Sequence, residues 1–275
     1  MPRHAASIAE EEINRFSQHA EDWWNPEGAF RPLHRLNPVR MEYVRDRACA
    51  HFGRDAGKPG ALKNLKILDV GCGGGLLAEP LARLGGAVTG IDASENTIFV
   101  ATRHAKKSGL AIDYRVAGVE KLAKKKTRYD LITALEVIEH VADVDSFVAS
   151  LTALLKPNGL LIMSTLNRTP KSFLLGIVAA EYILRWIPCG THEWKKFVRP
   201  SELARRLAAN GLRVDNLTGL VFNPLRNEFE LQAGDLDVNY MAAFSSPLVA
   251  GEGASSRKKP PHQENLSELR KSYVR

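Results

Sequence analysis

The feature that most constrains this chain is a regular alternation of apolar runs and helix-forming segments that begins at residue 65. The runs have the length of buried strands and read KILDVG, AVTGID, IDYRVAG, YDLITAL and GLLIMST, followed by two closing runs at residues 213–220 and 237–244. Parallel strands need long crossovers, which are right-handed and place helices on both faces of the sheet. The alternation therefore predicts an α/β fold with a doubly wound, mostly parallel sheet of seven strands.

The segment before this alternation is expected to be helical. Trp23 and Trp24 end an amphipathic stretch at helical spacing, and packing against the main domain is their expected role. Three prolines then predict turns before a helix over residues 41–52. The expected organisation is a helical extension at 1–64, a main domain at 65–244 containing an insertion at 166–200, and a disordered basic tail at 245–275.

A glycine-rich turn, DVGCGGG at residues 69–75, joins the first strand to the helix that follows it. The dinucleotide fingerprint G-x-G-x-x-G would need its third glycine at position 76, where this chain has Leu76. Glycines stand instead at Gly71, Gly73 and Gly75, and no P-loop Lys-Ser/Thr pair follows them. The turn therefore favours a ligand that the bare backbone approaches closely, rather than a bound pyrophosphate.

Asp92 ends the second strand, 17 residues after Gly75. Both oxygens of a carboxylate accept hydrogen bonds, so this side chain suits the two hydroxyls of a ribose. Nicotinamide-dependent enzymes have such an acid as well, so Asp92 indicates a nucleoside without choosing the cofactor. The choice against a dehydrogenase depends on Leu76.

A second polar cluster, EVIEHV, follows the fourth strand and contains Glu136, Glu139 and His140 at positions i, i+3 and i+4. In a helix these side chains would share one face, at the edge where open α/β sheets bind ligands. Two carboxylates and an imidazole suit a divalent metal such as Mg²⁺ or Zn²⁺, which would stabilise a phenolate nucleophile. His140 could instead be a general base, and helix capping without any metal is the structural alternative.

The motif G-x-G-x-G, preceded by Asp69, resembles the first motif of class I S-adenosylmethionine-dependent methyltransferases. A wider resemblance, to the bacterial ubiquinone-biosynthesis O-methyltransferases, runs from about residue 13 to 244. It rests on PLHRLNPVR, DVGCGGG, EVIEHV, STLNRTPKS, AEYILRWIPCGTHEWKKFVRPSEL and DVNYM. This resemblance implies S-adenosylmethionine as cofactor and O-methylation of polyprenyl catechols, namely 2-polyprenyl-6-hydroxyphenol intermediates and 3-demethylubiquinol.

The same resemblance implies the site residues. A guanidinium can clamp a carboxylate with two parallel hydrogen bonds, which suits Arg40 to the methionine end of the cofactor. The cofactor-binding residues would be Arg40, Gly71, Gly73, Gly75, Asp92, Gly118, Val119 and Leu135. A divalent ion would lie at Glu136, Glu139 and His140. Beside the resemblance, we expect either His140, where it is not itself a metal ligand, or His192 to accept the substrate proton.

The insertion contains an apolar segment, residues 173–187, that is too short to span a bilayer and has basic residues around it. A lid that contacts membrane or a lipid tail is preferred to a simple core helix. The chain has no secretory signal and no C-x-x-C pair, so we expect a cytoplasmic protein, peripheral to the inner face of the cytoplasmic membrane. The expected partners are a polyprenylated catechol, anionic membrane lipid and a ubiquinone-biosynthesis complex.

Other functions remain open at this stage. Another class I methyltransferase, acting on a quinone carbon or an unrelated phenol, would have the same glycine turn. Net charge is +7, but residues 257–275 carry +4 of it, which is typical of a solvated tail. No aromatic-basic interleaving favours an RNA methyltransferase, so nucleic acid is not expected as a partner. A non-catalytic module that keeps the fold is the last alternative.

Overall fold

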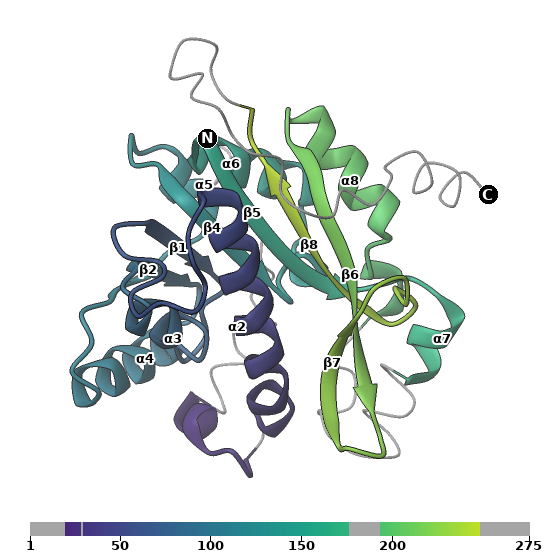
Figure 1. Ribbon diagram of the computed structural model, residues 1–275, viewed down its shortest axis with the longest axis horizontal. Coiled ribbons are helices and arrows are strands. Elements are labelled where there is room, and N and C mark those ends of the chain that lie inside the picture. Colours follow the sequence, from purple (N-terminus) through teal and green to yellow (C-terminus); the bar gives the residue numbers. More distant parts are fainter. Residues whose placement is uncertain (1–19, 29, 176–192, 248–275) are drawn as a thin grey trace, which may run out of the picture.

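The computed structural model describes residues 20–28, 30–175 and 193–247. Its centre is one eight-stranded sheet with the order β3-β2-β1-β4-β5-β8-β6-β7 (Figure 1). The strands are β1 Lys66–Val70, β2 Ala87–Asp92, β3 Asp113–Val116, β4 Tyr129–Leu135, β5 Leu155–Leu166, β6 Arg213–Asn223, β7 Glu228–Gln232 and β8 Asn239–Ser245. The first five strands pair in parallel, and β8, β6 and β7 add antiparallel pairs.

The predicted α/β, doubly wound sheet is confirmed, but it has one strand more than the seven expected. The additional strand is β7, which forms a hairpin with β6 at the sheet edge. Its sequence EFELQ alternates acidic or polar with apolar residues, and its side chains are only exposed or half-buried. The strand therefore lacks the continuous apolar run that marks the buried parallel strands.

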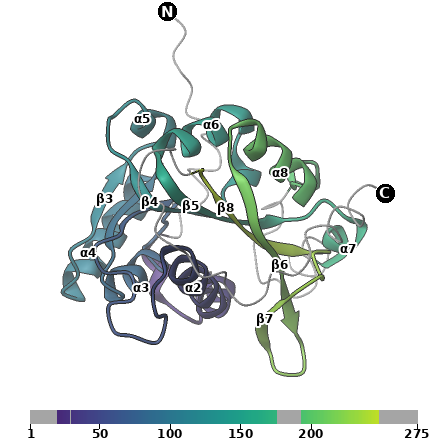
Figure 2. The ribbon, with the colours of Figure 1, turned by 45° about the horizontal axis from the view of Figure 1, so that its top comes forward.

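Helices cover both faces of the sheet, as the alternation predicted (Figure 2). On one face lie the helices that precede or directly follow β1 and β2, and on the other lie those around β4, β5 and β6. The first group is α2 Arg31–Phe52, α3 Ala78–Arg83 and α4 Glu95–Lys107; the second is α5 Val119–Ala123, α6 Val144–Leu154 and α8 Pro200–Ala209. The short elements are the 3₁₀ turns η1 Ala20–Trp24, η2 Ile138–His140 and η4 Trp194–Lys196, and α7 Pro170–Ser172.

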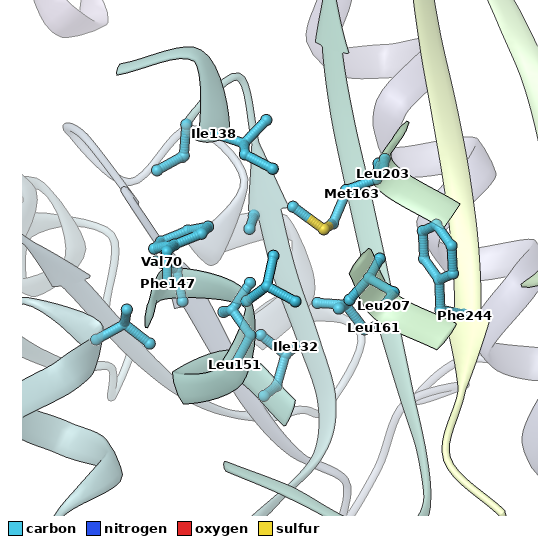
Figure 3. Close-up of a cluster of buried hydrophobic side chains, with 14 of the residues drawn as sticks. Val70, Ile132, Ile138, Phe147, Leu151, Leu161, Met163, Leu203, Leu207 and Phe244 are labelled. Atoms are coloured by element: carbon cyan, nitrogen blue, oxygen red, sulfur yellow. The ribbon is translucent and has the colours of Figure 1, made fainter. Parts of the chain in front are cut away.

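The larger hydrophobic core lies between the sheet and the layer formed by α5, α6 and α8 (Figure 3). Strands contribute through residues such as Ile132 and Leu161, and α6 through Phe147 and Leu151, all of them at most 1% exposed. Burying each such side chain fully contributes about 1.5–3 kcal/mol. This core fixes the central strands, and with them the edge of the sheet where their carboxyl ends meet.

The first long helix differs from the prediction. Helix α2 begins at Arg31, ten residues before the expected start at position 41, and Pro32 and Pro38 both lie within it. Pro32 is tolerated because N–H groups in the first turn of a helix have no intrahelical acceptor. Pro38 removes one hydrogen bond, and the packing of Tyr43 and Val44 against the core outweighs this loss. The early start matters because it places Arg40 in a regular helix.

Candidate active site

The glycine turn lies at the carboxyl end of β1, where the strand order reverses between β2 on one side and β4 on the other. Open α/β sheets bind ligands at such switch points. The turn is tied to β2, because the N–H groups of Gly71 and Cys72 donate to the Ile91 carbonyl at 2.8 and 3.0 Å. Gly71, Gly73 and Gly75 all have positive φ angles, of 67°, 52° and 92°. Glycine adopts such φ angles without steric strain, which explains why it occupies these three positions.

Close packing around the turn also excludes any side chain at two of these glycines. A Cβ atom at Gly73 would lie 2.3 Å from the Trp23 ring, and one at Gly71 would lie 2.6 Å from Val137. Protein segments thus approach the turn as closely as a ligand would, and no larger residue fits at either position. The fold itself therefore requires glycine at these two positions.

Asp92 lies beside this turn and is held by backbone N–H groups. One carboxylate oxygen accepts from Gly73 N at 3.1 Å, and the other accepts from Ser94 N at 2.9 Å. Burial raises the pKa of Asp92, and the bonds from these N–H groups oppose that rise. Each oxygen retains a lone pair for a ribose hydroxyl, so the geometry fits the role that the sequence predicted.

Arg40 is a buried cation with unused donors. It is 6% exposed, and its Nη2 lies 3.0 Å from Glu136 Oε1, close enough for an ion pair. That contact is not aligned as a hydrogen bond, and among the described residues neither Nε nor Nη2 has a hydrogen-bond acceptor. Unpaired donors of a buried guanidinium are costly. A carboxylate ligand would satisfy them, so Arg40 fits the methionine end of S-adenosylmethionine.

Glu136 and Glu139 are each held by polar side chains of the neighbouring strands. Glu136 Oε1 accepts from Ser164 Oγ at 2.7 Å, and Asn239 Nδ2 lies 3.2 Å from each oxygen of this carboxylate. Glu139 Oε2 accepts from Thr165 Oγ1 at 2.9 Å. Burial, followed by the negative charge of Glu136, holds the pKa of Glu139 well above its usual range. Burial therefore favours the neutral form of Glu139.

The expected metal site does not fit this arrangement. Glu136 has a positive φ of 54°, and only Ile138–His140 is helical, as a 3₁₀ turn, so the predicted shared helix face does not form. Across residues 20–28, 30–175 and 193–247, no three His, Cys, Asp or Glu side chains are grouped so that they could hold a metal ion. The carboxylate of Glu136 instead pairs with Arg40 and accepts hydrogen bonds from Ser164 and Asn239.

Of the two histidines considered as proton acceptors, only His140 lies within the described residues. His140 is half-buried at the end of η2, beside the carboxyl end of β4. His192 lies outside the described residues, as do most of the apolar insertion segment and all but three residues of the predicted tail.

The remaining predicted cofactor residues lie around the same edge. Gly118 caps α5 directly after β3, which pairs with β2 beside Asp92. Val119 is 2% exposed and belongs to the core, so its contribution to a ligand site would come from the backbone. Leu135 ends β4, directly before Glu136, and its half-buried side chain lies against the core under α2 and α3.

Sequence reasoning missed the side chains that hold the two glutamates. Ser164 and Thr165 end β5, and Asn239 begins β8. All three are buried polar residues inside otherwise apolar strands. The available signal was a polar residue at a terminus of a buried strand: STLN has it at the carboxyl end of β5, and DVNYM has it at the amino end of the antiparallel β8.

The comparisons with known proteins agree with this geometry. A family model described as a methyltransferase domain matches residues 41–217. Among solved structures, the plantazolicin methyltransferase BpumL superposes with a TM-score of 0.60 at 17% identity, covering 86% of this chain and 98% of that one. Magnesium protoporphyrin IX methyltransferase from Synechocystis PCC 6803 superposes with a TM-score of 0.57 at 17% identity, covering 86% and 93%.

The fold and the site together define a class I S-adenosylmethionine-dependent methyltransferase. Ubiquinone biosynthesis O-methyltransferase from Rhizobium etli is 49% identical over 242 residues, 88% of this chain and 97% of the relative. The protein of the same name from Chelativorans sp. is 51% identical over 238 residues, 86% of this chain and 94% of the relative. The chain belongs to the family of ubiquinone biosynthesis O-methyltransferases.

Proposed function

We propose that this enzyme transfers a methyl group from S-adenosylmethionine to a catechol hydroxyl of polyprenylated intermediates in ubiquinone biosynthesis, namely 2-polyprenyl-6-hydroxyphenol intermediates and 3-demethylubiquinol. The main support is that relatives with this named role align with the chain over nearly their whole length at about half identity. The methyltransferase-domain match, residues 41–217, includes the glycine turn, Asp92 and Glu136.

When bound, the cofactor supplies a methyl group on a positively charged sulfur. The backbone at residues 71–75 would receive its methionine end, with the carboxylate on Arg40 and the ribose hydroxyls on Asp92. Methyl transfer needs alignment of nucleophile, methyl carbon and sulfur, and it needs exclusion of water. The buried contacts of Arg40 and Asp92 would provide the alignment.

The protein must also remove a proton from the catechol, because a phenol near pKa ~10 is mostly neutral at physiological pH. His140 is the proposed acceptor. An imidazole nitrogen would take the proton of the substrate O–H, and the oxygen would bond to the methyl carbon as that carbon separates from the sulfur of the cofactor, leaving neutral S-adenosylhomocysteine. The imidazolium would then return its proton to solvent.

Contact with an anionic membrane surface is part of the proposal, because the substrates carry polyprenyl chains. Strand β6 runs in the same direction as β5, since both pair antiparallel with β8, so the β6–β7 hairpin tip extends beyond the ligand-binding edge (Figure 1). At this tip Leu225 is 96% exposed and has Arg226 beside it. The start of the insertion adds the exposed residues Phe173, Leu174 and Leu175.

These exposed apolar groups support a peripheral position, at the inner face of the cytoplasmic membrane and within reach of other enzymes of the pathway. None of the helices in the described ranges has the length and apolar character needed to cross a bilayer. Membrane contact would therefore come from such surface residues, as in other interfacial proteins.

The experiment is an assay with methyl-labelled S-adenosylmethionine and a short-chain polyprenyl catechol, with and without vesicles and chelator. We expect an aryl methyl ether whose formation survives excess chelator, because the glutamates are engaged by protein side chains. Label on a ring carbon would favour the C-methyltransferase alternative. Activity that chelator removes and Mg²⁺ or Zn²⁺ restores would contradict proton removal by His140 alone.

A further inference from the structure

The 3₁₀ turn η1, residues 20–24, lies across the outside of the glycine turn, and we refer to it as the strap. Trp24 attaches it: the indole Nε1 donates to the Gly74 carbonyl at 2.9 Å. The same indole stacks on His104 of α4, with ring centroids 3.4 Å apart and an interplanar angle of 8°. The strap is thus fixed both to the cofactor turn and to the helix that follows Asp92.

His104, the residue on which Trp24 stacks, is itself held by a buried glutamate of α3. His104 Nδ1 lies 2.6 Å from Oε1 of Glu79, a side chain of α3 that is 1% exposed. Since the pair joins α3 to α4, the stacking surface under Trp24 is part of the folded core. The position of the strap relative to the glycine turn is therefore well defined.

Trp23, the neighbouring residue, faces the turn. Its ring contacts the backbone of Gly73 and Gly74 so closely that a Cβ at either position would clash with it. The indole also stacks on Phe30 with ring centroids 4.0 Å apart, and Trp23 is only 7% exposed. Its carbonyl oxygen lies 2.9 Å from His34 Nε2. Every part of this residue has a partner except the indole N–H, which among the described residues is buried without an acceptor.

Helix α2 carries further polar side chains that contact the strap and the end of the glycine turn. His34, Asn37 and Arg40 follow one another at intervals of three residues, so they lie along one side of the helix. His34 contacts the strap, and Asn37 Nδ2 donates to the Leu76 carbonyl, just after the glycine turn, at 2.7 Å. Arg40 comes next and meets Glu136. Its Nε and Nη2 and the Trp23 Nε1 are three buried N–H donors along this border that lack hydrogen-bond acceptors within the described ranges.

We propose that Trp23 is a cofactor-binding residue, whose indole N–H is a second donor, beside Arg40, to the α-carboxylate of S-adenosylmethionine. A carboxylate has lone pairs enough for a guanidinium and an indole at once. Buried N–H groups without acceptors are unfavourable, so a ligand that satisfies all three gains affinity from relieving them. The inference rests on the cofactor assignment and on the proposed function.

The test replaces Trp23 by Phe, which keeps an aromatic ring beside the glycine turn and removes the N–H. Binding of S-adenosylmethionine and of decarboxylated S-adenosylmethionine, which lacks only the carboxylate, is measured by calorimetry. We expect the variant to bind the normal cofactor about ten-fold or more weakly, as for a lost hydrogen bond to a charged group. Its affinity for the decarboxylated compound should match that of the wild type.

A matched control is Trp194→Phe, because this half-buried indole also donates to a carbonyl, that of Thr169 at 3.0 Å, but in a different part of the fold. The control should leave both affinities unchanged. Equal weakening of both compounds by Trp23→Phe would assign Trp23 a packing role and overturn the proposal, as would no weakening of either. Failure of the wild type to bind S-adenosylmethionine would instead overturn the cofactor assignment and the proposed function.

A second substitution guards against loss of packing in the smaller Phe side chain. Benzothienylalanine at position 23 has nearly the shape of tryptophan with sulfur in place of the N–H. It should reproduce the selective loss of affinity for the carboxylate-bearing compound. Normal affinity for both compounds with this residue would show that the N–H is not a donor to the cofactor.

Discussion

Asp69 is buried at the end of β1, and the Thr133 hydroxyl donates to one of its oxygens at 2.8 Å. Burial raises the pKa of this carboxyl to about 7, and the charge of Asp92 adds to the rise. Because the folded-state pKa lies above the unfolded value, folding favours the neutral acid. The stabilising contribution of the neutral acid is complete below the unfolded pKa near 4 and is lost as pH rises to about 7.

Asp69→Asn should therefore stabilise the cofactor-free protein at high pH only. At pH 8 the gain in free energy of unfolding is at most about 4 kcal/mol, since about three pKa units separate the folded and unfolded states. The gain should shrink steadily between pH 7 and pH 4. Urea denaturation of both proteins at pH 5 and pH 8 measures it, and an equal difference at the two pH values would contradict the assignment.

Arg40 is predicted to bind the cofactor carboxylate with two donors, which lysine cannot do. Arg40→Lys keeps the positive charge beside Glu136, so the fold should survive while the affinity for S-adenosylmethionine falls at least about ten-fold. Arg45→Lys is the control, since Arg45 lies on the same helix and pairs with Asp46 near the surface. Calorimetric titration showing equal affinities for the two variants would remove Arg40 from the cofactor site.

At the residue scale, the positions of the glycine turn and of Asp92 at the ends of β1 and β2 could be predicted because they depend on local sequence. The positive φ angles of Gly71, Gly73 and Gly75 explain why glycine occupies these positions. The shared helix face expected for the metal set does not form, because Glu136 has a positive φ and its carboxylate lies 3.0 Å from Arg40 Nη2. A glutamate in that conformation is not predictable from sequence, since the backbone strain is imposed by the surrounding fold.

At the scale of elements, the strap and the glycine turn form one packed unit. Gly73→Ala would place a Cβ 2.3 Å from the Trp23 ring and would force alanine into a positive φ. Gly109→Ala separates the two effects, because Gly109 has a φ of 68° and nothing within 4 Å of a Cβ.

The backbone strain alone should cost about 1–2 kcal/mol at Gly109, and the clash should raise the cost at Gly73 by about 1–3 kcal/mol more. Chemical denaturation of the two variants measures the difference. Equal destabilisation would mean that Trp23 moves away freely, and the strap would then not be fixed to the turn.

The elements themselves could mostly be predicted, because buried parallel strands and amphipathic helices have clear periodicities. Two failures have physical causes. The start of α2 was hidden by Pro32 and Pro38, which suggest turns unless a helix packs well enough to include them. Strand β7 was not predicted because a short edge strand with exposed and half-buried side chains has the composition of a polar loop.

At the scale of the whole molecule, exposed apolar residues should direct the ligand-binding edge toward the membrane. Leu225→Ser at the hairpin tip should lower binding to anionic vesicles about three- to ten-fold, because a leucine side chain gains roughly 1.5–3 kcal/mol on full burial and about half of that on partial insertion into the interface. Activity on a short-chain, water-soluble catechol should not change.

Phe99→Ser provides the matched control for vesicle binding. Phe99 is 61% exposed, but it lies on α4, which packs on β2 and β3 at the opposite end of the sheet from the hairpin. Sedimentation with vesicles should show a loss for Leu225→Ser only. Equal losses for both variants would mean that general surface hydrophobicity, rather than the hairpin tip, drives the association.

The central claim is that an adenosyl cofactor binds at residues 71–75, with its ribose on Asp92 and its carboxylate on Arg40. A crystal structure with S-adenosylhomocysteine tests it most directly. We expect both ribose hydroxyls within hydrogen-bond distance of the Asp92 carboxylate and the amino-acid carboxylate on the Arg40 guanidinium. A structure with the turn empty at saturating ligand, or with a nicotinamide coenzyme bound there instead, would contradict the account.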